Sequence, residues 1–399
     1  MSSSFSQESV LIGDQTVKLY SWKEALKADK QLVTAIQYVW YENGSPTTLP
    51  AELVDFPNLV YLDLSHSPKV TDFTLLTKLT SLRTLLFGSY TAIPPAELWQ
   101  LSWLNKLKLE GGSSDYKCTT IEGIEALAAL EELDLSFNDL SEIPAGFRNL
   151  KNLRVIDLSY NSKIIDATEL GFLPALEKLN ISDCSVTEIP ASFANLNSLR
   201  AFRANGRLDI EGISNLKNCT LLEELALPSY FMTAFPVELL LLPLKSLSLT
   251  SCQFTDYSFL ANFGKLEILS LTYCKMNAVP KEISGLTNLK YLYLYNSSGL
   301  SDISAVQNLT KLESLNLRSC NVTSIPASIG TCTSLKEVEL GNNVGLTSIE
   351  NLGQCKNLEF VDIDGCVLVP KTEIAALKKL TGCYVSTSYD MSYKYHFGN

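Results

Sequence analysis

Aliphatic residues recur along this chain in the six-residue pattern L-x-x-L-x-L, with single substitutions in some copies. From Leu59 onward, successive copies begin 22 or 23 residues apart, except for one interval of 26 residues. Because alternate side chains of a strand point to opposite faces, each copy predicts a short strand with its leucines on one face. A degenerate copy starts at Val33, and the others start at Leu59, Leu82, Leu104, Leu130, Leu153, Leu176, Leu199, Leu222, Leu244, Leu266, Leu289, Leu312, Leu335 and Leu358.

A unit of this length is too short to bury its own leucines, so consecutive units must stack on one another. Stacking gives one parallel strand per unit and a continuous leucine core. Fifteen strands at about 4.8 Å spacing make a sheet on the order of 70 Å long. The repeat therefore predicts one elongated domain, although 399 residues would ordinarily suggest two or three globular ones.

The segments that follow the strands are of two kinds, and the two kinds alternate. One kind contains a proline, as in "SEIPAGF", and the other has none, as in "VTDFTLL". Proline fixes φ and removes a hydrogen-bond donor, so it suits a tight return segment and is excluded from a central strand. The true period is therefore a pair of units, or about 45 residues. The prolines in question are Pro50, Pro94, Pro144, Pro190, Pro236, Pro280, Pro326 and Pro370.

This pattern resembles the leucine-rich repeat family over residues 30–386. The proline units are similar to those of plant and bacterial repeat proteins, and the other units are similar to those of internalins. The resemblance implies an α/β solenoid: a right-handed leucine-rich repeat horseshoe with a concave parallel β-sheet and helical caps. It also implies a non-enzymatic protein- or peptide-binding scaffold that uses the concave face.

Both ends of the chain carry signals for a capping helix. Ser21 has Glu24 three residues later, which is the spacing of a capping box. Near the other end, Pro370 is placed to begin a helix and Gly382 to end it. These signals predict a finished solenoid, and we expect the alternating tail at 389–397 to cover its last turn. The expected divisions are 1–32 for an N-terminal segment and capping helix, 33–369 for the repeats, and 370–399 for a capping helix, last strand and tail.

The third, fifth and seventh positions of each copy are expected on the concave sheet face, opposite the leucines. Three tyrosines occupy them in one copy, "LKYLYLY". Tyrosine offers a large rigid contact area with a polar tip, and tyrosine and arginine are enriched in binding hot spots. The alternative is that these aromatic residues only suit an exposed strand and pack on one another. The predicted partner-binding residues are Ile268, Tyr273, Tyr291, Tyr293, Tyr295, Arg318 and Phe360.

Other parts of the concave face carry weaker signals of a binding site. In the N-terminal half it carries charges of both signs, from Asp63 to Arg203, which is typical of a solvated surface. The one long interval places its extra residues at 110–120, as a loop near a ligand or as a neutral insertion. The copy "LRAFRANGR" replaces a leucine with Ala204 and a later Asn with Arg207, which indicates a local bend or a contact.

The position after the strand is filled by Asn138, Asn161 and Asn343, and we expect these amides to satisfy the backbone at each turn. In other copies cysteine takes this position. A cysteine repeated in one structural position behaves as a small buried hydrophobe, so we expect reduced thiols and a reducing compartment. No secretory leader is visible, which favours the cytoplasm; a removed leader would instead allow secretion or surface exposure. The cysteines concerned are Cys184, Cys252, Cys274, Cys320 and Cys366.

The net charge of −11 is spread without long runs of one sign, which argues against nucleic-acid binding. No apolar stretch is long enough for a transmembrane helix, so we expect no membrane insertion. Histidine occurs only at His66 and His396, and no CxxC pair appears, so a metal site has little support. No hydrolase, nucleotide-binding or metalloprotease motif is present. We therefore expect a non-enzyme without cofactors, and a monomer.

Two other functions remain open from the sequence. Exposed aromatic residues beside Asp and Asn also suit sugar rings, which would make the chain a carbohydrate-binding surface protein. Some relatives are regulatory or effector proteins that act on a signalling partner. Fold alone does not decide among these partners.

Overall fold

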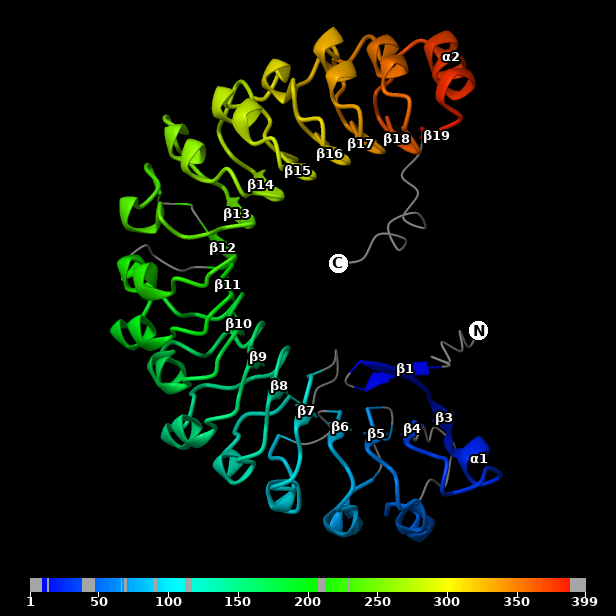
Figure 1. Ribbon diagram of the computed structural model, residues 1–399, viewed down its shortest axis with the longest axis vertical. Helices are drawn as coiled ribbons and strands as arrows, with labels where there is room; N and C mark the ends of the chain where they lie inside the picture. The colour runs from blue at the N-terminus through cyan, green and yellow to red at the C-terminus, as the bar shows by residue number, and fades with distance from the viewer. Residues whose placement is uncertain are drawn as a thin grey trace. The chain divides into compact units, whose positions relative to one another are not determined.

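The computed structural model describes residues 9–387, apart from 13, 38–46, 66, 68–69, 89–91, 112–116, 207–211, 229 and 231. It divides into an N-terminal half, Met1–Arg207, and a C-terminal half, Leu208–Asn399. In each half the strands lie side by side along one edge, and the short helices lie on the opposite side of the repeats (Figure 1). The predicted solenoid of stacked repeats is confirmed in both halves.

The N-terminal half begins with an antiparallel hairpin of β1 (Ser9–Ile12) and β2 (Gln15–Lys18). A parallel sheet follows, with neighbours in sequence order. Its strands are β3 (Tyr20–Ser21), β4 (Ala35–Gln37), β5 (Tyr61–Asp63), β6 (Thr84–Leu86), β7 (Lys106–Lys108), β8 (Glu132–Asp134), β9 (Val155–Asp157), β10 (Lys178–Asn180) and β11 (Ala201–Arg203).

The C-terminal half continues the same plan, again with parallel neighbours in sequence order. Its strands are β12 (Glu224–Pro228), β13 (Ser246–Thr250), β14 (Ile268–Thr272), β15 (Tyr291–Tyr293), β16 (Ser314–Asn316), β17 (Glu337–Glu339), β18 (Phe360–Asp362) and β19 (Tyr384–Ser386). The register places equivalent leucines side by side, as in Leu292 beside Leu315. This alignment makes the buried aliphatic core continuous from repeat to repeat.

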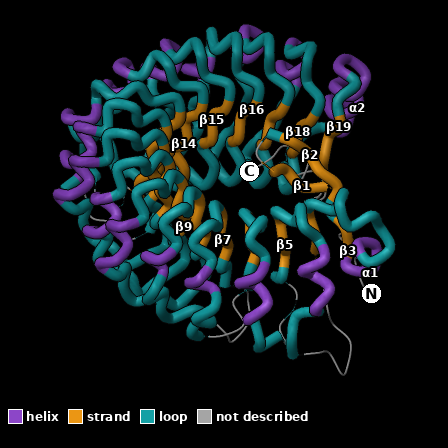
Figure 2. The backbone as a smooth tube through the Cα atoms, turned by 60° about the horizontal axis from the view of Figure 1, so that its bottom comes forward, coloured by secondary structure: helices purple, strands orange, loops and turns teal. Residues whose placement is uncertain are grey.

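The return segments contain short 3-10 helices of three to six residues, seen on the side away from the strands (Figure 2). In the N-terminal half they are η1 (Ala51–Asp55), η2 (Thr74–Lys78), η3 (Leu98–Gln100), η4 (Ile124–Ala126), η5 (Ala145–Asn149), η6 (Thr168–Phe172) and η7 (Ala191–Asn195). In the C-terminal half they are η8 (Ile213–Asn218), η9 (Val237–Leu239), η10 (Ser258–Asn262), η11 (Lys281–Gly285), η12 (Ser304–Val306), η13 (Ala327–Thr331) and η14 (Glu350–Gln354).

The two kinds of repeat start their 3-10 helices differently. In the proline kind, the fixed φ of proline sets the entry, and the Pro144 carbonyl accepts the Phe147 N–H at 2.9 Å. In the other kind, an aspartate side chain often caps the first turn of the helix, as where Asp302 accepts the Ser304 N–H at 2.8 Å. That hydrogen bond holds the pKa of the Asp302 carboxyl below its ordinary value. The alternation read from the sequence therefore corresponds to two ways of beginning the same turn.

Two α-helices lie where helix signals were predicted. The first, α1 (Trp22–Ala25), is a single turn whose capping box forms, since the Ser21 N–H donates to Glu24 at 2.9 Å. The second, α2 (Lys371–Thr381), ends at Gly382, which has φ of 74°. Glu373 in α2 accepts the Ile349 N–H at 2.8 Å, which ties the helix to η14. The tail at 389–397 lies outside the described residues, and the division at 32 and 369 stays a prediction.

The predicted asparagine ladder is buried and bonds neighbouring repeats together. Asn343, for example, donates to the Leu317 carbonyl at 2.9 Å and accepts the Val322 N–H at 2.9 Å. Cysteine in the same position can also donate, since the Cys320 thiol reaches the Leu294 carbonyl at 3.3 Å, but a thiol has one hydrogen where the amide has two. Cysteine therefore satisfies the turn more weakly than asparagine does.

Most of the cysteines are reduced as expected, but one pair is not. Cys252 and Cys274 occupy this position in adjacent repeats and are joined by a disulfide. The other eight cysteines form no disulfide and are buried, and burial raises the pKa of the Cys184 thiol to about 11. The prediction of wholly reduced thiols is therefore wrong for this pair, because parallel stacking brings their Cα atoms within 4.8 Å.

A charge ladder runs along the edge of the sheet at the residue just before each strand. From Glu131 onward acidic residues introduce proline repeats and basic residues introduce the other repeats. Neighbours of opposite sign pair, as in Lys290–Glu267 at 2.7 Å and Lys336–Glu313 at 2.7 Å. The N-terminal half carries Glu131, Arg154, Glu177 and Arg200, and the C-terminal half carries Glu223, Lys245, Glu267, Lys290, Glu313, Lys336 and Glu359.

Reversing one charge of this ladder is expected to destabilise the fold in a salt-dependent way. In a Lys290→Glu variant a carboxylate would stand between Glu267 and Glu313, so thermal unfolding should occur at lower temperature in low salt. The deficit should shrink in about 1 M NaCl, where charges are screened within about 3 Å. The exposed Lys217 is the matched control, since Lys217→Glu makes the same charge change outside the ladder. Equal deficits for both variants would contradict a pairing role.

Candidate functional site

The tyrosines of β15 lie on the strand face, opposite the core. Tyr291 and Tyr293 are half-buried, whereas Leu292 and Leu294 between and beside them are fully buried. Tyr295 follows the strand and is half-buried as well. The alternation predicted from the sequence is therefore what the structure shows.

Residues of the preceding repeat complete a cluster around these rings. Ile268 on β14 pairs with Tyr291 in the register of the sheet. Tyr273 is 53% exposed, and its ring meets that of Tyr295 edge-to-face at 6.0 Å. Tyr273 has φ of 58°, unusual for an aromatic residue, and its N–H donates to the Tyr295 carbonyl at 3.1 Å. We call Ile268, Tyr273, Tyr291, Tyr293 and Tyr295 the tyrosine patch.

Phe360 lies outside this cluster. It is three strands from Tyr291, on β18, with Ser314 and Glu337 between them in the register. Its ring stacks on that of Tyr384 of β19, with centroids 6.1 Å apart. Phe360 thus belongs to a second aromatic pair at the end of the same sheet.

Arg318 is engaged within the chain. Its guanidinium pairs with Asp362 and, at 3.2 Å, with Asp364, both two repeats further on. It passes over Gly341, where a Cβ atom would collide with the guanidinium. The Arg318 side chain is 16% exposed. The geometry favours a role in holding these two aspartates over a role as a free anchor.

Two carboxylates next to the tyrosine patch were not among the predicted residues. Glu337 and Glu339 occupy the face of β17, with β16 between them and β15. Burial raises the pKa of Tyr293 to about 12, and the nearby Tyr291, Glu337 and Glu339 add to this effect. The same reading of third and fifth positions that selected the tyrosines would have found both glutamates.

Family models match this chain in three segments. A model described as a leucine-rich repeat region matches residues 243–394, a model of two leucine-rich repeat copies matches 128–171, and a single-repeat model matches 175–196. The chain belongs to the leucine-rich repeat family.

Solved leucine-rich repeat structures agree with this assignment. The match to a Leptospira interrogans leucine-rich repeat protein covers 93% of this chain and 100% of that protein, with a TM-score of 0.66 and 24% identity. The match to the Listeria monocytogenes internalin InlF covers 87% of this chain and 89% of the internalin structure, with a TM-score of 0.56 and 24% identity. A third match is the ectodomain of the Arabidopsis thaliana receptor kinase GASSHO1/SCHENGEN3, in complex with CASPARIAN STRIP INTEGRITY FACTOR 2. It covers 83% of this chain and 44% of the ectodomain, with a TM-score of 0.56 and 22% identity. At these identities the likeness shows the fold.

One curated relative has a different kind of name. An adenylate cyclase of Schizosaccharomyces pombe is 36% identical over 106 residues, which make up 26% of this chain and 5% of the cyclase. The chain thus spans a small fraction of the length of that relative. The similarity concerns this short stretch, and the name of the whole cyclase does not transfer to this chain.

On the strand face of the N-terminal half, charged residues of β7 and β8 pair with one another. Lys106 meets Glu132 at 2.5 Å, and Lys108 meets Glu110 at 2.5 Å and Asp134 at 3.2 Å. These pairs explain the mixed charges expected to form a solvated surface. Residues 112–116 of the long insertion lie outside the described residues, as does Arg207, whereas Ala204 is buried.

An exposed aromatic pair in the N-terminal half was not predicted. Phe137 and Tyr160 stack with centroids 4.2 Å apart, and 41% and 48% of their areas are exposed. Both have positive φ, at 59° and 60°, because they occupy the left-handed turn position before the ladder asparagine. A search of the sequence for aromatic residues at that turn would have found them.

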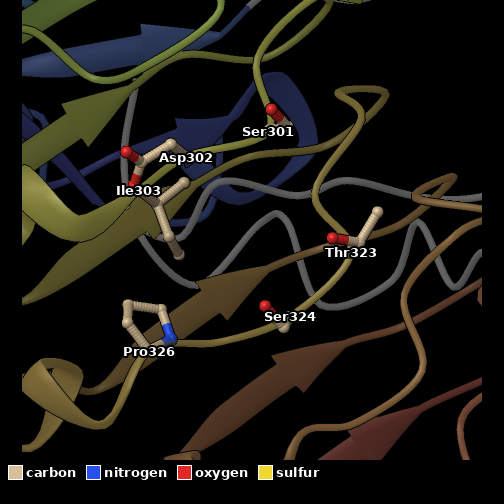
Figure 3. A pocket seen from close by; sticks show the side chains of 6 residues that line it. All are labelled: Ser301, Asp302, Ile303, Thr323, Ser324 and Pro326. Atoms are coloured by element: carbon tan, nitrogen blue, oxygen red, sulfur yellow. The ribbon is translucent and has the colours of Figure 1, made fainter.

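The return segments of two consecutive repeats form an open hollow of about 270 Å³ (Figure 3). Its lining comes from Ser301, Asp302, Ile303, Thr323, Ser324 and Pro326. Asp302, its ionisable residue, already caps η12. Among the described residues no group of His, Cys, Asp and Glu is arranged to hold a metal ion, and no helix is long and apolar enough to cross a bilayer. The hollow is therefore explained by the turns that form it.

Proposed function

We propose that the chain binds a protein or peptide segment through the tyrosine patch on the strand face of the C-terminal half. The observation that carries this proposal is that the side chains of β15 alternate between core leucines and outward tyrosines. Leu292 and Leu294 fill the core, so the fold does not need the neighbouring Tyr291 and Tyr293 for its interior. Their rings nevertheless stand side by side on the open face, where tyrosine is enriched in binding hot spots.

The wider family supports a scaffold of this kind. Leucine-rich repeat proteins typically serve as non-enzymatic scaffolds, and the GASSHO1/SCHENGEN3 ectodomain was solved with a bound partner. Concave repeat surfaces are common binding surfaces. The edge-to-face contact between Tyr273 and Tyr295 gives the competing explanation, in which the rings only stabilise one another. Partner binding and mutual packing predict different results for a single truncation.

Truncating one central ring separates the two explanations. In a Tyr293→Ala variant we expect at least a tenfold loss of affinity for partners captured from the native extract, because a central hot-spot ring is lost. The melting temperature should remain close to that of the wild type, since the leucine core is intact. Surface plasmon resonance on the captured partner and thermal unfolding by circular dichroism provide the two readouts.

The matched control is Tyr230, which is 54% exposed and lies outside the strand face of the same half. Tyr230→Ala should leave affinity unchanged. A Tyr293→Ala variant that binds normally but melts at lower temperature would support packing and exclude the patch as the binding site.

A carbohydrate ligand is the second candidate, and the stacked Phe137–Tyr160 pair is the observation that favours it. Exposed aromatic faces are suited to the C–H surface of a sugar ring. Binding of the wild type to a glycan array, lost in a Tyr160→Ala variant and retained in Tyr293→Ala, would favour this function over protein binding.

A further inference from the structure

The described part of the strand face of the C-terminal half is strongly acidic. Over the described outward positions of β12–β19, and of the residues two beyond β15–β18, one cation faces five carboxylates, a net charge of −4. The cation is Arg318, and it is already paired with Asp362 and Asp364. The carboxylates are Glu224, Glu337, Glu339, Asp362 and Asp364.

This acidity is concentrated beside the tyrosine patch. Ser314 and Asn316 of β16 are 6% and 7% exposed, and they form a strip that separates the tyrosines of β15 from the glutamates of β17. Glu337 accepts a hydrogen bond from Ser314, so its carboxylate lies toward this strip. Burial and the neighbouring Glu339 together raise the pKa of Glu337, which means that the surroundings disfavour its charge. A cation brought to this strip would relieve that unfavourable electrostatic environment.

Lysine and arginine have the chemistry that such a strip selects. Their head groups pair with carboxylates and are attracted to tyrosine faces, and their aliphatic stems pack on apolar rings. An acidic segment would meet like charge at every carboxylate of this face. In the N-terminal half, Lys106 and Lys108 pair with Glu132, Glu110 and Asp134 on the same strand face.

We propose that the partner is a basic peptide segment, whose lysine or arginine side chains dock between Tyr291 and Tyr293 on one side and Glu337 and Glu339 on the other. This inference rests on the proposed function and specifies the class of its ligand. Attraction of a basic segment to an acidic face also accelerates association at low ionic strength.

A phage-displayed library of random linear peptides, selected on the folded chain at low ionic strength, tests the inference. We expect the recovered peptides to be enriched in lysine and arginine over the unselected library, and to bind more weakly as salt is raised. A Glu337→Gln/Glu339→Gln variant should bind these peptides about tenfold more weakly. Glu359→Gln is the matched control, because Glu359 belongs to the edge ladder, and it should bind like the wild type.

The outcomes separate this inference from the proposed function. Peptides without basic enrichment that lose affinity on Tyr293→Ala would overturn the inference and leave the patch as the binding site. Basic peptides that bind both the double variant and Tyr293→Ala normally would overturn both. Recovery of no peptide above the background of a Tyr291/Tyr293/Tyr295 triple alanine variant would also overturn both. A circular dichroism melt of the double variant confirms folding, which neutralising two adjacent carboxylates is not expected to impair.

Discussion

Replacing Asn161 with alanine is expected to lower the free energy of unfolding by about 3 kcal/mol. Asn161 is fully buried in the N-terminal half and donates to the carbonyls of Leu135 at 2.9 Å and Leu158 at 2.8 Å. Its side-chain oxygen accepts the Leu140 N–H at 3.1 Å. Alanine would leave buried backbone groups without partners, each costing about 1–3 kcal/mol.

The chain itself offers the matched control for this substitution. Cys184 occupies the equivalent position one repeat later, and its thiol donates to the Leu158 carbonyl at 3.2 Å. Asn161→Cys should therefore keep one donated hydrogen bond and lose both the second one and the acceptor for the Leu140 N–H, which gives an intermediate loss. Urea midpoints are the appropriate measure, because repeat arrays need not unfold in one step. Equal losses for alanine and cysteine would show that the donor contributes nothing.

Removing the Arg318 guanidinium is expected to cost about 3 kcal/mol, since breaking a buried ion pair leaves an uncompensated charge. The Asp362 side chain is only 7% exposed, so water would replace the lost partner poorly. Arg318→Met retains the aliphatic stem and isolates the loss of charge. We expect a markedly lower melting temperature by calorimetry.

Neutralising the aspartate should reverse part of this loss. In the Arg318→Met background, Asp362→Asn removes the stranded carboxylate and should raise the melting temperature. The double-mutant cycle then gives the coupling energy of the pair. An Arg318→Met variant as stable as the wild type would mean that the guanidinium is available to a partner after all.

The strands and the outward tyrosines were predictable because one short pattern specifies both. A period of 22 or 23 residues fixes which leucines stack, and the alternation of side chains along Tyr291–Tyr295 then fixes which residues face outward. No long-range information is needed for either conclusion. The same logic explains why each half reproduces the same arrangement.

The role of Arg318 was not predictable from its own repeat, because its partners lie 44 and 46 residues away. The contact depends on Gly341 in the intervening repeat, where any side chain would obstruct the guanidinium. Comparing the seventh positions of three consecutive repeats would have shown Arg, Gly and Asp in order. The Cys252–Cys274 disulfide differs in kind, because stacking brings the thiols together while oxidation depends on the surroundings.

The alternating edge charges bear on how such an array can change in length. Deleting a single repeat between Glu131 and Glu359 would bring two residues of like sign into register, whereas deleting two adjacent repeats would preserve attraction at the new junction. Duplication follows the same rule, because adding one repeat places residues of like sign side by side and adding two preserves the alternation. Gene rearrangements that add or remove repeats in even numbers are therefore the ones this chain tolerates best.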